Sequence, residues 1–217
     1  MSLTLYAHPF SSYCRKVLIA LYENELAFDY RLVEGAEAWE QLKSLWSHRK
    51  MPLLIDDGSI IVESSIILEY LDQHYPGKLR LLPEDPDAAR EVRFMDRYFD
   101  LYVMTPMNKI VADYLRPEEH RNPEDIRQAK EQLDTTYAWL NERLVPGQWA
   151  YGEQFSLADC AAAPALFYAD WVHEIPEEFA SLRSYRQKLF AKPGMARAVD
   201  EARPYRHYFP PGAPDRD

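Results

Sequence analysis

Hydrophobic residues in the first third of the chain alternate between the spacing of a strand and the spacing of a helix. Residues 3–7 predict a strand, and a helical pattern begins at Ser11 or Ser12, whose hydroxyl groups suit a helix N-cap. A second strand is expected over residues 28–33. Two strands separated by one helix predict a right-handed, parallel βαβ unit.

A hairpin and a further helix are predicted next. The apolar runs 51–55 and 59–62 flank the Asp-Asp-Gly sequence at 56–58, and two apolar runs around Asp-Gly favour a β-hairpin. Residues 64–74 place apolar side chains on one helical face, and Pro76-Gly77 ends this helix. The predicted element order is therefore β-α-β-α-β-β-α.

The rest of the chain has helical periodicity. It follows a segment at 82–86 that is rich in turn formers, and no strand is expected after Val62. The periodic stretches are 87–114, 123–144, 156–172 and 179–189. We therefore predict an α/β domain over 1–79, a linker over 80–86 and an all-helical domain over 87–217.

Composition excludes some classes of function. Of the 217 residues, 47% are hydrophobic and 13% are aromatic, which is enough apolar material for a packed core and argues against general disorder. The net charge is -10, from 35 acidic and 25 basic residues, and no block rich in Lys and Arg offsets it. A polyanion would be repelled at long range, so nucleic-acid binding is not expected.

Neither a membrane segment nor a metal site is expected. No signal peptide is visible, and no apolar stretch reaches the ~18 residues that span a bilayer. Cys14 and Cys160 are consistent with two reduced thiols in a cytoplasmic protein. The six histidines form no His-x-x-x-His pattern, and the sequence contains no phosphate-binding glycine loop.

The first candidate site is the turn at 9–15, between the first strand and the first helix. A helix N-terminus offers unpaired N–H groups and partial positive charge, which favour an anion such as a thiolate. A hydrogen bond to a charged group contributes about 1.5–3 kcal/mol, so the Ser11 hydroxyl would lower the pKa of a bound thiol by about one to two pH units. The alternative is that Ser11 and Ser12 only cap the helix.

Two further candidates lie at other junctions of the same small sheet. A cis peptide bond at Met51-Pro52 would leave the backbone of Met51 free to pair with an extended peptide, whereas a trans proline at a strand edge is the common alternative. Ser64, predicted as the N-cap of the helix at 64–74, would hold a carboxylate, and Glu63 an ammonium. Together they would bind an α-amino-acid group, and simple capping is the alternative.

Together these motifs resemble the glutathione transferase superfamily, and the resemblance covers nearly the whole chain. It rests on the Ser-Ser-Tyr-Cys-Arg stretch at 11–15, on Met51-Pro52, on Glu63-Ser64 and on the Ser-Leu-Ala-Asp stretch at 156–159. The first stretch resembles the serine-using classes of theta, delta and zeta type. The resemblance implies a thioredoxin-like N-terminal domain followed by an all-α C-terminal bundle.

The resemblance also implies roles for individual residues. Ser11 would be the catalytic residue that activates the glutathione thiol, Met51 and Pro52 would bind the cysteinyl backbone, and Glu63 with Ser64 would hold the γ-glutamyl end. Many relatives carry Asn-Pro-x-Gly-Lys before the cis proline, whereas this chain has Trp-Ser-His-Arg-Lys at 46–50. Arg49 and Lys50 are thus the predicted partners of the glycyl carboxylate. Ser156 and Asp159 would cap a buried helix without touching substrate.

A pocket for the second substrate is expected between the domains. The predicted lining residues are Tyr98, Tyr102 and Met107 on the helix at 87–114 and Tyr208 in the Pro- and aromatic-rich tail at 204–217. Met104, Asn108, Tyr205, His207 and Phe209 are further candidates. Such side chains suit apolar electrophiles, and packing within the core is the alternative for most of them.

The expected function is a homodimeric glutathione transferase that uses glutathione as its co-substrate. Isomerase, dehalogenase or peroxidase activity, or a non-catalytic binding role, are the alternatives within the same fold. Cys14 occupies the second position of the glutaredoxin Cys-x-x-Cys motif, and Ser11 replaces the first cysteine, which argues against dithiol exchange. We expect Cys14 to pack inward, with a lone reactive thiol as the alternative.

Overall fold

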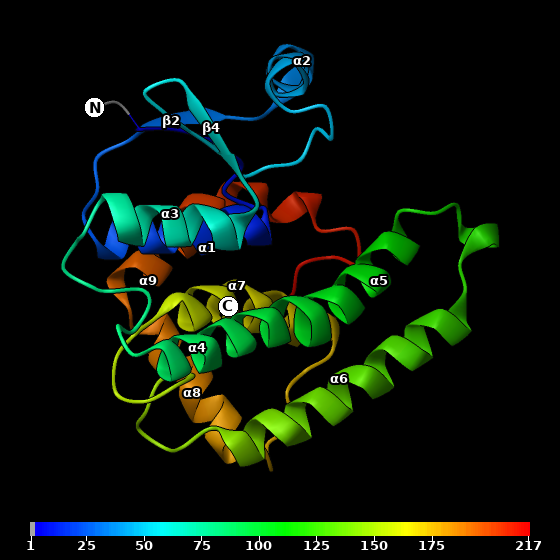
Figure 1. Cartoon of the computed structure of the whole chain (residues 1–217). Coiled ribbons are helices and arrows are strands. Elements are labelled where there is room, and N and C mark those ends of the chain that lie inside the picture. Colours follow the sequence, from blue (N-terminus) through cyan, green and yellow to red (C-terminus); the bar gives the residue numbers. More distant parts are fainter. Residues whose placement is uncertain (1–2) are drawn as a thin grey trace.

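A computed structural model describes residues 3–217 and contains one small mixed sheet above a larger group of helices (Figure 1). The strands are β1 (Leu3–Ala7), β2 (Asp29–Leu32), β3 (Leu53–Asp56) and β4 (Ser59–Val62), in the spatial order β2-β1-β3-β4. β1 pairs in parallel with β2 and antiparallel with β3, which pairs antiparallel with β4. The predicted βαβ unit and hairpin are both confirmed.

The turn between β3 and β4 explains why the hairpin was predictable. Asp57 and Gly58 both have positive φ, at 44° and 87°. A two-residue hairpin turn with positive φ at both central positions matches the twist of the flanking strands, and an Asp-Gly pair tolerates that conformation. The register pairs Asp56 with Ser59, so Asp57 and Gly58 alone form the loop.

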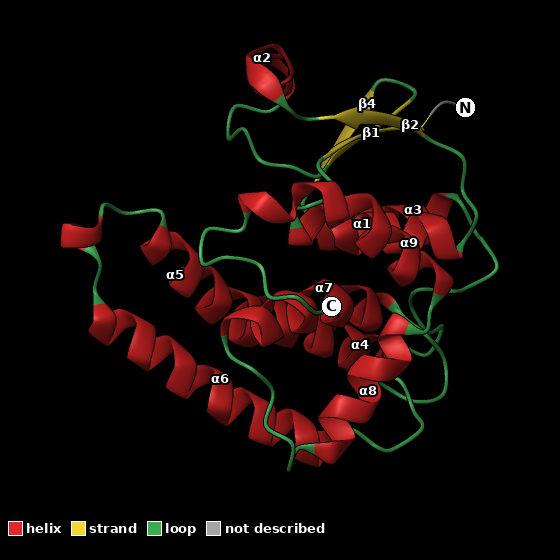
Figure 2. Cartoon of the chain, turned by 180° about the vertical axis from the view of Figure 1, so that it is seen from behind, coloured by secondary structure: helices red, strands yellow, loops and turns green. Residues whose placement is uncertain are grey.

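Helices cover both faces of the sheet. α1 (Ser12–Glu23) and α3 (Ser64–His74) lie on the side facing the helical part, and α2 (Gly35–Leu45) lies on the opposite side (Figure 2). Buried Leu5, Leu18, Leu54 and Ile67 belong to the apolar cluster between the sheet and the first two of these helices. The predicted order β-α-β-α-β-β-α is confirmed, and with it the thioredoxin-like arrangement of this part.

The helical part is all-α, as predicted. Its main helices are α4 (Pro86–Tyr98), α5 (Thr105–Tyr114), α6 (Pro123–Arg143), α7 (Leu157–Val172), α8 (Ala180–Phe190) and α9 (Pro193–Ala202). The predicted helix over 87–114 is continuous, but a π-helical segment, Phe99–Met104, joins α4 to α5. A short 3-10 turn, Glu118–His120, precedes α6, and another, Arg203–Tyr208, follows α9. Of the predicted linker at 80–86, residues 80–85 lie between α3 and α4, and Pro86 is the first residue of α4.

α9 was not predicted because its sequence begins with Pro193-Gly194, which is typical of a turn. Proline is tolerated in the first turn of a helix, where its missing N–H breaks no bond. Gly194 lies against α1: a Cβ there would come within 2.8 Å of a Glu23 carboxylate oxygen and 3.1 Å of the Ile19 carbonyl oxygen. The contact between α9 and α1 therefore requires glycine at this position.

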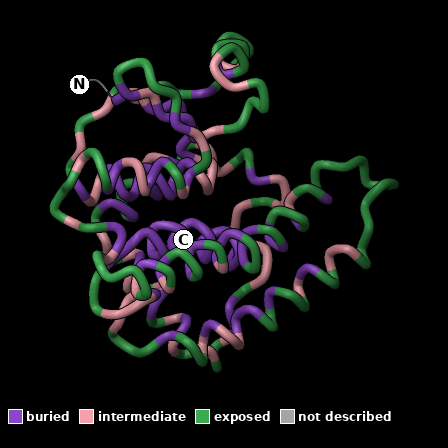
Figure 3. The backbone as a smooth tube through the Cα atoms, viewed as in Figure 1, coloured by how far each residue is buried: buried purple, intermediate pink, exposed green. Residues whose placement is uncertain are grey.

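α7 is the central helix of the molecule and is buried along nearly its whole length (Figure 3). Its small alanine side chains let α1 and α4 pack closely against it. The helix is apolar but also begins with a buried charge, Asp159. None of the helices in the described part of the chain combines the length and the apolar character needed to cross a bilayer.

Asp159 forms a hydrogen-bonded cap at the start of α7. Its carboxylate accepts hydrogen bonds from the Ser156 N–H (2.8 Å), the Ser156 hydroxyl (3.0 Å), the Ala150 N–H (2.8 Å) and the Tyr185 hydroxyl (2.7 Å). The side chain is fully buried, and the predicted capping box is confirmed. One carboxylate thus ties the preceding loop and α8 to the first turn of α7.

We predict that Asp159→Ala lowers the free energy of unfolding by about 3–5 kcal/mol, because it leaves several buried donors without an acceptor. Urea denaturation followed by circular dichroism measures the change. The matched control is Asp87→Ala, an exposed aspartate in the first turn of α4, for which less than about 1 kcal/mol is expected. Equal losses in the two variants would contradict a structural role for Asp159.

Candidate functional site

Two adjoining cavities meet at the N-terminus of α1. The first, called here the polar cavity, has a volume of about 480 Å³. The seven residues predicted to bind glutathione all line it: Ser11, Arg49, Lys50, Met51, Pro52, Glu63 and Ser64. The second, called here the tail cavity, has a volume of about 300 Å³ and is bounded by the C-terminal tail. Ser11 and Tyr13 line both cavities.

Ser11 caps α1 and still has a proton to donate. Its side-chain oxygen accepts a hydrogen bond from the Cys14 N–H at 3.4 Å, and its own N–H donates to the His8 carbonyl at 3.0 Å. A hydroxyl has two acceptor lone pairs and one donor proton, so capping does not consume the donor. The capping role and the proposed role toward a thiol are therefore compatible at one oxygen.

The loop before β3 forms another wall of the polar cavity. The peptide bond between Met51 and Pro52 is cis, as the family resemblance implied. Arg49 lies in the same loop with positive φ (54°), and its guanidinium pairs with Glu40 at 3.0 Å. Because Arg49 already has an acidic partner, Lys50 is the cation of this loop that is better placed to meet a ligand carboxylate.

The start of α3 differs by one residue from the prediction. Ser64 was predicted as the N-cap, but the cap is Glu63, whose φ of 71° turns the chain from β4 into the helix, and Ser64 is the first helical residue. The prediction relied on the preference for serine over glutamate at the N-cap, and it was wrong. The chain turns from β4 into α3 at Glu63, one residue before Ser64. Ser64 is buried and lines the cavity at the positive end of α3.

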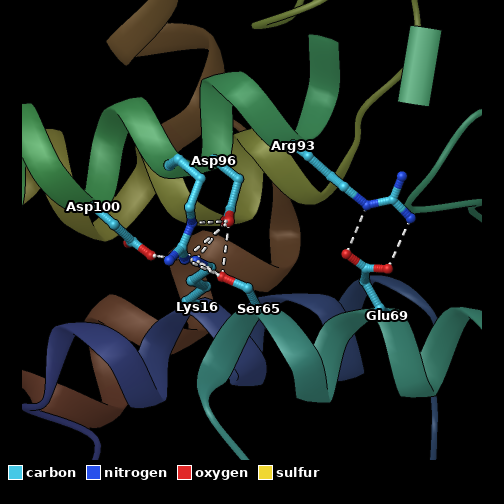
Figure 4. A network of polar contacts seen from close by, with 7 residues as sticks. Lys16, Ser65, Glu69, Arg93, Asp96 and Asp100 are labelled. Carbon is cyan, nitrogen blue, oxygen red and sulfur yellow. Dashed lines mark hydrogen bonds and ion pairs between the residues drawn. The ribbon is translucent and has the colours of Figure 1, made fainter. Parts of the chain in front are cut away.

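A buried network of charged side chains lies beside the polar cavity (Figure 4). The Lys16 ammonium, 1% exposed, contacts Asp96 at 2.5 Å, Asp100 at 3.0 Å and the Ser65 hydroxyl at 2.9 Å. Arg97 contacts Asp100 at 2.7 Å. Burial raises the pKa of Asp100, and the Lys16 charge opposes that rise. The network joins α1 and α3 to the end of α4.

Arg97 and Asp100 line the polar cavity, and sequence reasoning missed both. The available signal was the four-residue spacing of Asp96 and Asp100, which places two carboxylates on one helical face. A lysine at position 16, directly before an apolar helical stretch, was the matching signal on α1. No local pattern links the two stretches, because the paired residues are eighty or more positions apart.

The tail cavity contains only part of the predicted second-substrate set. Met107 and Tyr208 line it, together with Asn108, Tyr168 and Phe209. The remaining lining residues are Phe10, Ser11, Ser12, Tyr13, Val111 and Pro210. Its walls thus come from α1, α5, α7 and the tail, and they are mostly apolar and aromatic.

Tyr98 and Tyr102, the other two predicted residues, do not line this cavity. Their rings stack on each other with centroids 4.8 Å apart, and the Tyr98 ring stacks on Trp139 of α6 at 4.1 Å. Both tyrosines therefore lie on the side of α6. Met107 and Asn108, on α5, lie on a different face of the continuous helix and line the cavity. The alternative of packing between helices applies to Tyr98, whereas Tyr102 is 47% exposed.

Comparison with known proteins identifies the family. A model of the glutathione S-transferase N-terminal domain matches residues 5–79, and a model of the glutathione S-transferase C-terminal domain matches residues 123–188. Glutathione S-transferase U25 of Arabidopsis thaliana is 30% identical over 175 residues, covering 79% of this chain and 72% of that protein. The chain belongs to the glutathione S-transferase family.

Other relatives in this family have different names. A probable maleylacetoacetate isomerase of Vibrio cholerae is 29% identical, covering 94% of this chain and 98% of that protein. A stringent starvation protein A homolog of Coxiella burnetii is 25% identical, covering 92% of each chain. Family membership therefore leaves the particular activity open.

A solved structure supports the same fold. It is a glutathione S-transferase from Methylobacterium radiotolerans in complex with glutathione sulfonate, with a TM-score of 0.77 and 25% identity. The alignment covers 92% of this chain and 95% of that one. Both the thioredoxin-like part and the helical part are thus those of a glutathione transferase.

Cys14 is fully buried in this glutathione transferase fold. It lies on the face of α1 that packs against the sheet. Burial raises the pKa of its thiol to about 11. Cys160 is also buried, on α7, and burial raises its pKa as well. Among residues 3–217, no group of three or more His, Cys, Asp or Glu side chains is placed to hold a metal ion.

We predict that Cys14→Ala keeps most of the glutathione-dependent activity and lowers the free energy of unfolding by about 1 kcal/mol, since only packing is lost. At pH 7 a thiol with a pKa of about 11 is ionised to the order of one part in ten thousand. An alkylating reagent should therefore label Cys14 only after unfolding in urea, as measured by mass spectrometry. Rapid labelling of the folded protein with loss of activity would show a reactive cysteine.

Proposed function

We propose that this protein is a glutathione transferase that ionises the glutathione thiol at Ser11 and adds it to a small, mostly apolar electrophile. The observation that supports this most strongly is that Ser11 lines both the polar cavity and the apolar, aromatic tail cavity. A sulfur atom held at Ser11 would face a charged peptide site on one side and an apolar substrate site on the other.

The polar cavity suits the charges of glutathione. At the γ-glutamyl end, the N-terminus of α3 at Ser64 favours the carboxylate, and Glu63 favours the ammonium. At the other end, Lys50 favours the glycyl carboxylate, with Arg49 beside it. Between these two ends, the loop of Met51 and Pro52 would pair with the peptide backbone. The thiol of the central residue then points toward Ser11.

The start of α1 would stabilise the thiolate. The Ser11 hydroxyl donates one charge-assisted hydrogen bond, and the first turn of α1 contributes partial positive charge without any acidic side chain to offset it. A single such hydrogen bond lowers the pKa of the thiol by about one to two pH units. Much of the bound glutathione would thus be ionised near neutral pH.

Glutathione-dependent isomerisation is the second candidate. The relative named probable maleylacetoacetate isomerase aligns with almost the whole chain at 29% identity. The same thiolate can add reversibly to a conjugated double bond and leave after rotation, which isomerises the substrate without net transfer. A panel of haloalkanes, enones and a cis-configured diketo acid distinguishes transfer from isomerisation by the product formed.

We predict that Ser11→Ala raises the pKa of the bound glutathione thiol by about one to two pH units and lowers kcat/KM near neutral pH by about tenfold to a hundredfold. The deficit should shrink at alkaline pH, where the thiol ionises without help. Ultraviolet titration of the thiolate and a pH profile of kcat/KM measure both effects.

The matched control for this prediction is Ser11→Thr, which keeps a hydroxyl and an N-cap acceptor and should retain more activity than alanine. Isothermal titration of the unaltered protein with glutathione is the prior test. Absence of binding at millimolar glutathione would reject the transferase proposal, and so would an unchanged thiol pKa in Ser11→Ala.

A homodimer is part of this proposal. Ile66 on α3 and Phe94, Leu101 and Tyr102 on the α4 side are between 43% and 54% exposed. The paired Glu69 and Arg93 side chains join α3 to α4 (Figure 4). Exposed apolar side chains on both parts of the chain, called here the apolar patch, are typical of a protein interface, and a second copy would cover them.

We predict that Phe94→Glu shifts the protein from dimer to monomer in light scattering, because a charge placed in a buried apolar interface is costly to desolvate. Leu115→Glu is the control, since Leu115 is exposed at the end of α5 and lies outside the patch. A monomeric mass for the unaltered protein, or equal dissociation in both variants, would contradict the dimer proposal.

A further inference from the structure

Tyr13 lies where the two cavities meet. It is the second residue of α1, it is half-buried, and it lines both the polar cavity and the tail cavity. Ser11 is the other residue shared by the two cavities. A sulfur atom at Ser11 that attacks an electrophile in the tail cavity would therefore form its bond beside Tyr13.

We infer that Tyr13 is a further catalytic residue, whose hydroxyl donates a proton to the oxygen of an electrophile as the thiolate adds. The inference rests on the proposed function and specifies its substrates as electrophiles that gain negative charge on oxygen, such as enones and epoxides. Ser11 would stabilise the negative charge on sulfur before the attack, and Tyr13 would neutralise the negative charge that develops on oxygen during the attack.

The surroundings of Tyr13 keep it in the donor form. Burial and the nearby Asp100 carboxylate raise the pKa of Tyr13 above the ordinary value. The Arg97 charge and the Asn108 side chain, which lines the tail cavity, oppose this rise. A neutral phenol keeps its O–H as a donor toward a ligand in the cavity. A protonated phenol suits an acid rather than a base.

The chemical step balances for an enone. The glutathione sulfur forms a bond to the β-carbon, the carbon–carbon π electrons move toward the carbonyl, and negative charge develops on the carbonyl oxygen. That oxygen takes the proton of Tyr13 to give an enol, which tautomerises to the ketone. The tyrosinate then recovers, through solvent, the proton that the glutathione thiol released on ionisation. With an epoxide, the carbon–oxygen bond breaks and the alkoxide oxygen takes the same proton.

An alkyl halide needs no such proton. The sulfur forms a bond to carbon while the carbon–halogen bond breaks, and the halide leaves with the electron pair. A residue that only shapes the cavity should affect both substrate types alike, whereas a proton donor should affect only substrates that place charge on oxygen. The two substrate types therefore separate a catalytic role for Tyr13 from a packing role.

The test compares Tyr13→Phe with the unaltered protein, using an α,β-unsaturated ketone and benzyl bromide as electrophiles at saturating glutathione. We expect kcat/KM to fall by about tenfold to a hundredfold with the ketone and by less than about threefold with the halide. Ultraviolet titration should show an unchanged thiol pKa. Tyr114→Phe is the matched control, since Tyr114 is exposed on α5 outside both cavities and should change neither rate.

Three results would overturn the inference: equal losses with both electrophiles, no loss with the ketone, or a raised thiol pKa, which would assign Tyr13 to the sulfur. A solvent deuterium isotope effect on the ketone reaction of the unaltered protein, larger than that on the halide reaction, is an expected result that does not depend on a variant. If the unaltered protein transfers glutathione to neither electrophile, the proposed function fails and this inference fails with it.

Discussion

The ion pairs of Lys16 with Asp96 and Asp100 determine how the two parts of this molecule meet. A lysine that is 1% exposed is tolerated only when its charge is paired, because removing one partner from such a pair costs several kcal/mol. Lys16 is on α1, which begins beside Ser11, and the two aspartates lie on α4 and the π-helical segment after it. The pairing therefore helps to fix the distance between the start of α1 and the end of α4.

Both cavities lie at the junction between the two parts that these ion pairs help to hold. The polar cavity takes its walls from α1, the loop before β3, the start of α3 and the end of α4, and the tail cavity takes its walls from α1, α5, α7 and the C-terminal tail. The overall charge of the chain is negative, yet Lys50 and two helix N-termini give parts of the polar cavity local positive character. An anionic peptide can thus bind to an acidic protein.

The tail cavity takes part of its wall from the C-terminal segment of the chain. Tyr208 and Phe209 form part of its wall, and the Asp217 carboxylate pairs with Arg206 at 3.0 Å and also with Arg203, which holds the tail against the preceding helical turn. The last part of the chain therefore supplies one wall of the proposed second-substrate site, and the other walls come from α1, α5 and α7.

Local sequence patterns were sufficient to predict the strands, the Asp-Gly hairpin and a serine cap at Ser11 or Ser12, since each depends on residues close together in the chain. The family resemblance implied the cap formed by Ser156 and Asp159 and the cis bond at Met51-Pro52. Tertiary structure alone decided that Tyr98 and Tyr102 face α6, that Glu63 rather than Ser64 caps α3, and that Lys16 pairs across the two parts. The physical reason is that a helix packs against elements that are distant in the sequence. Those elements determine which way its side chains point and which residue pairs with a buried charge.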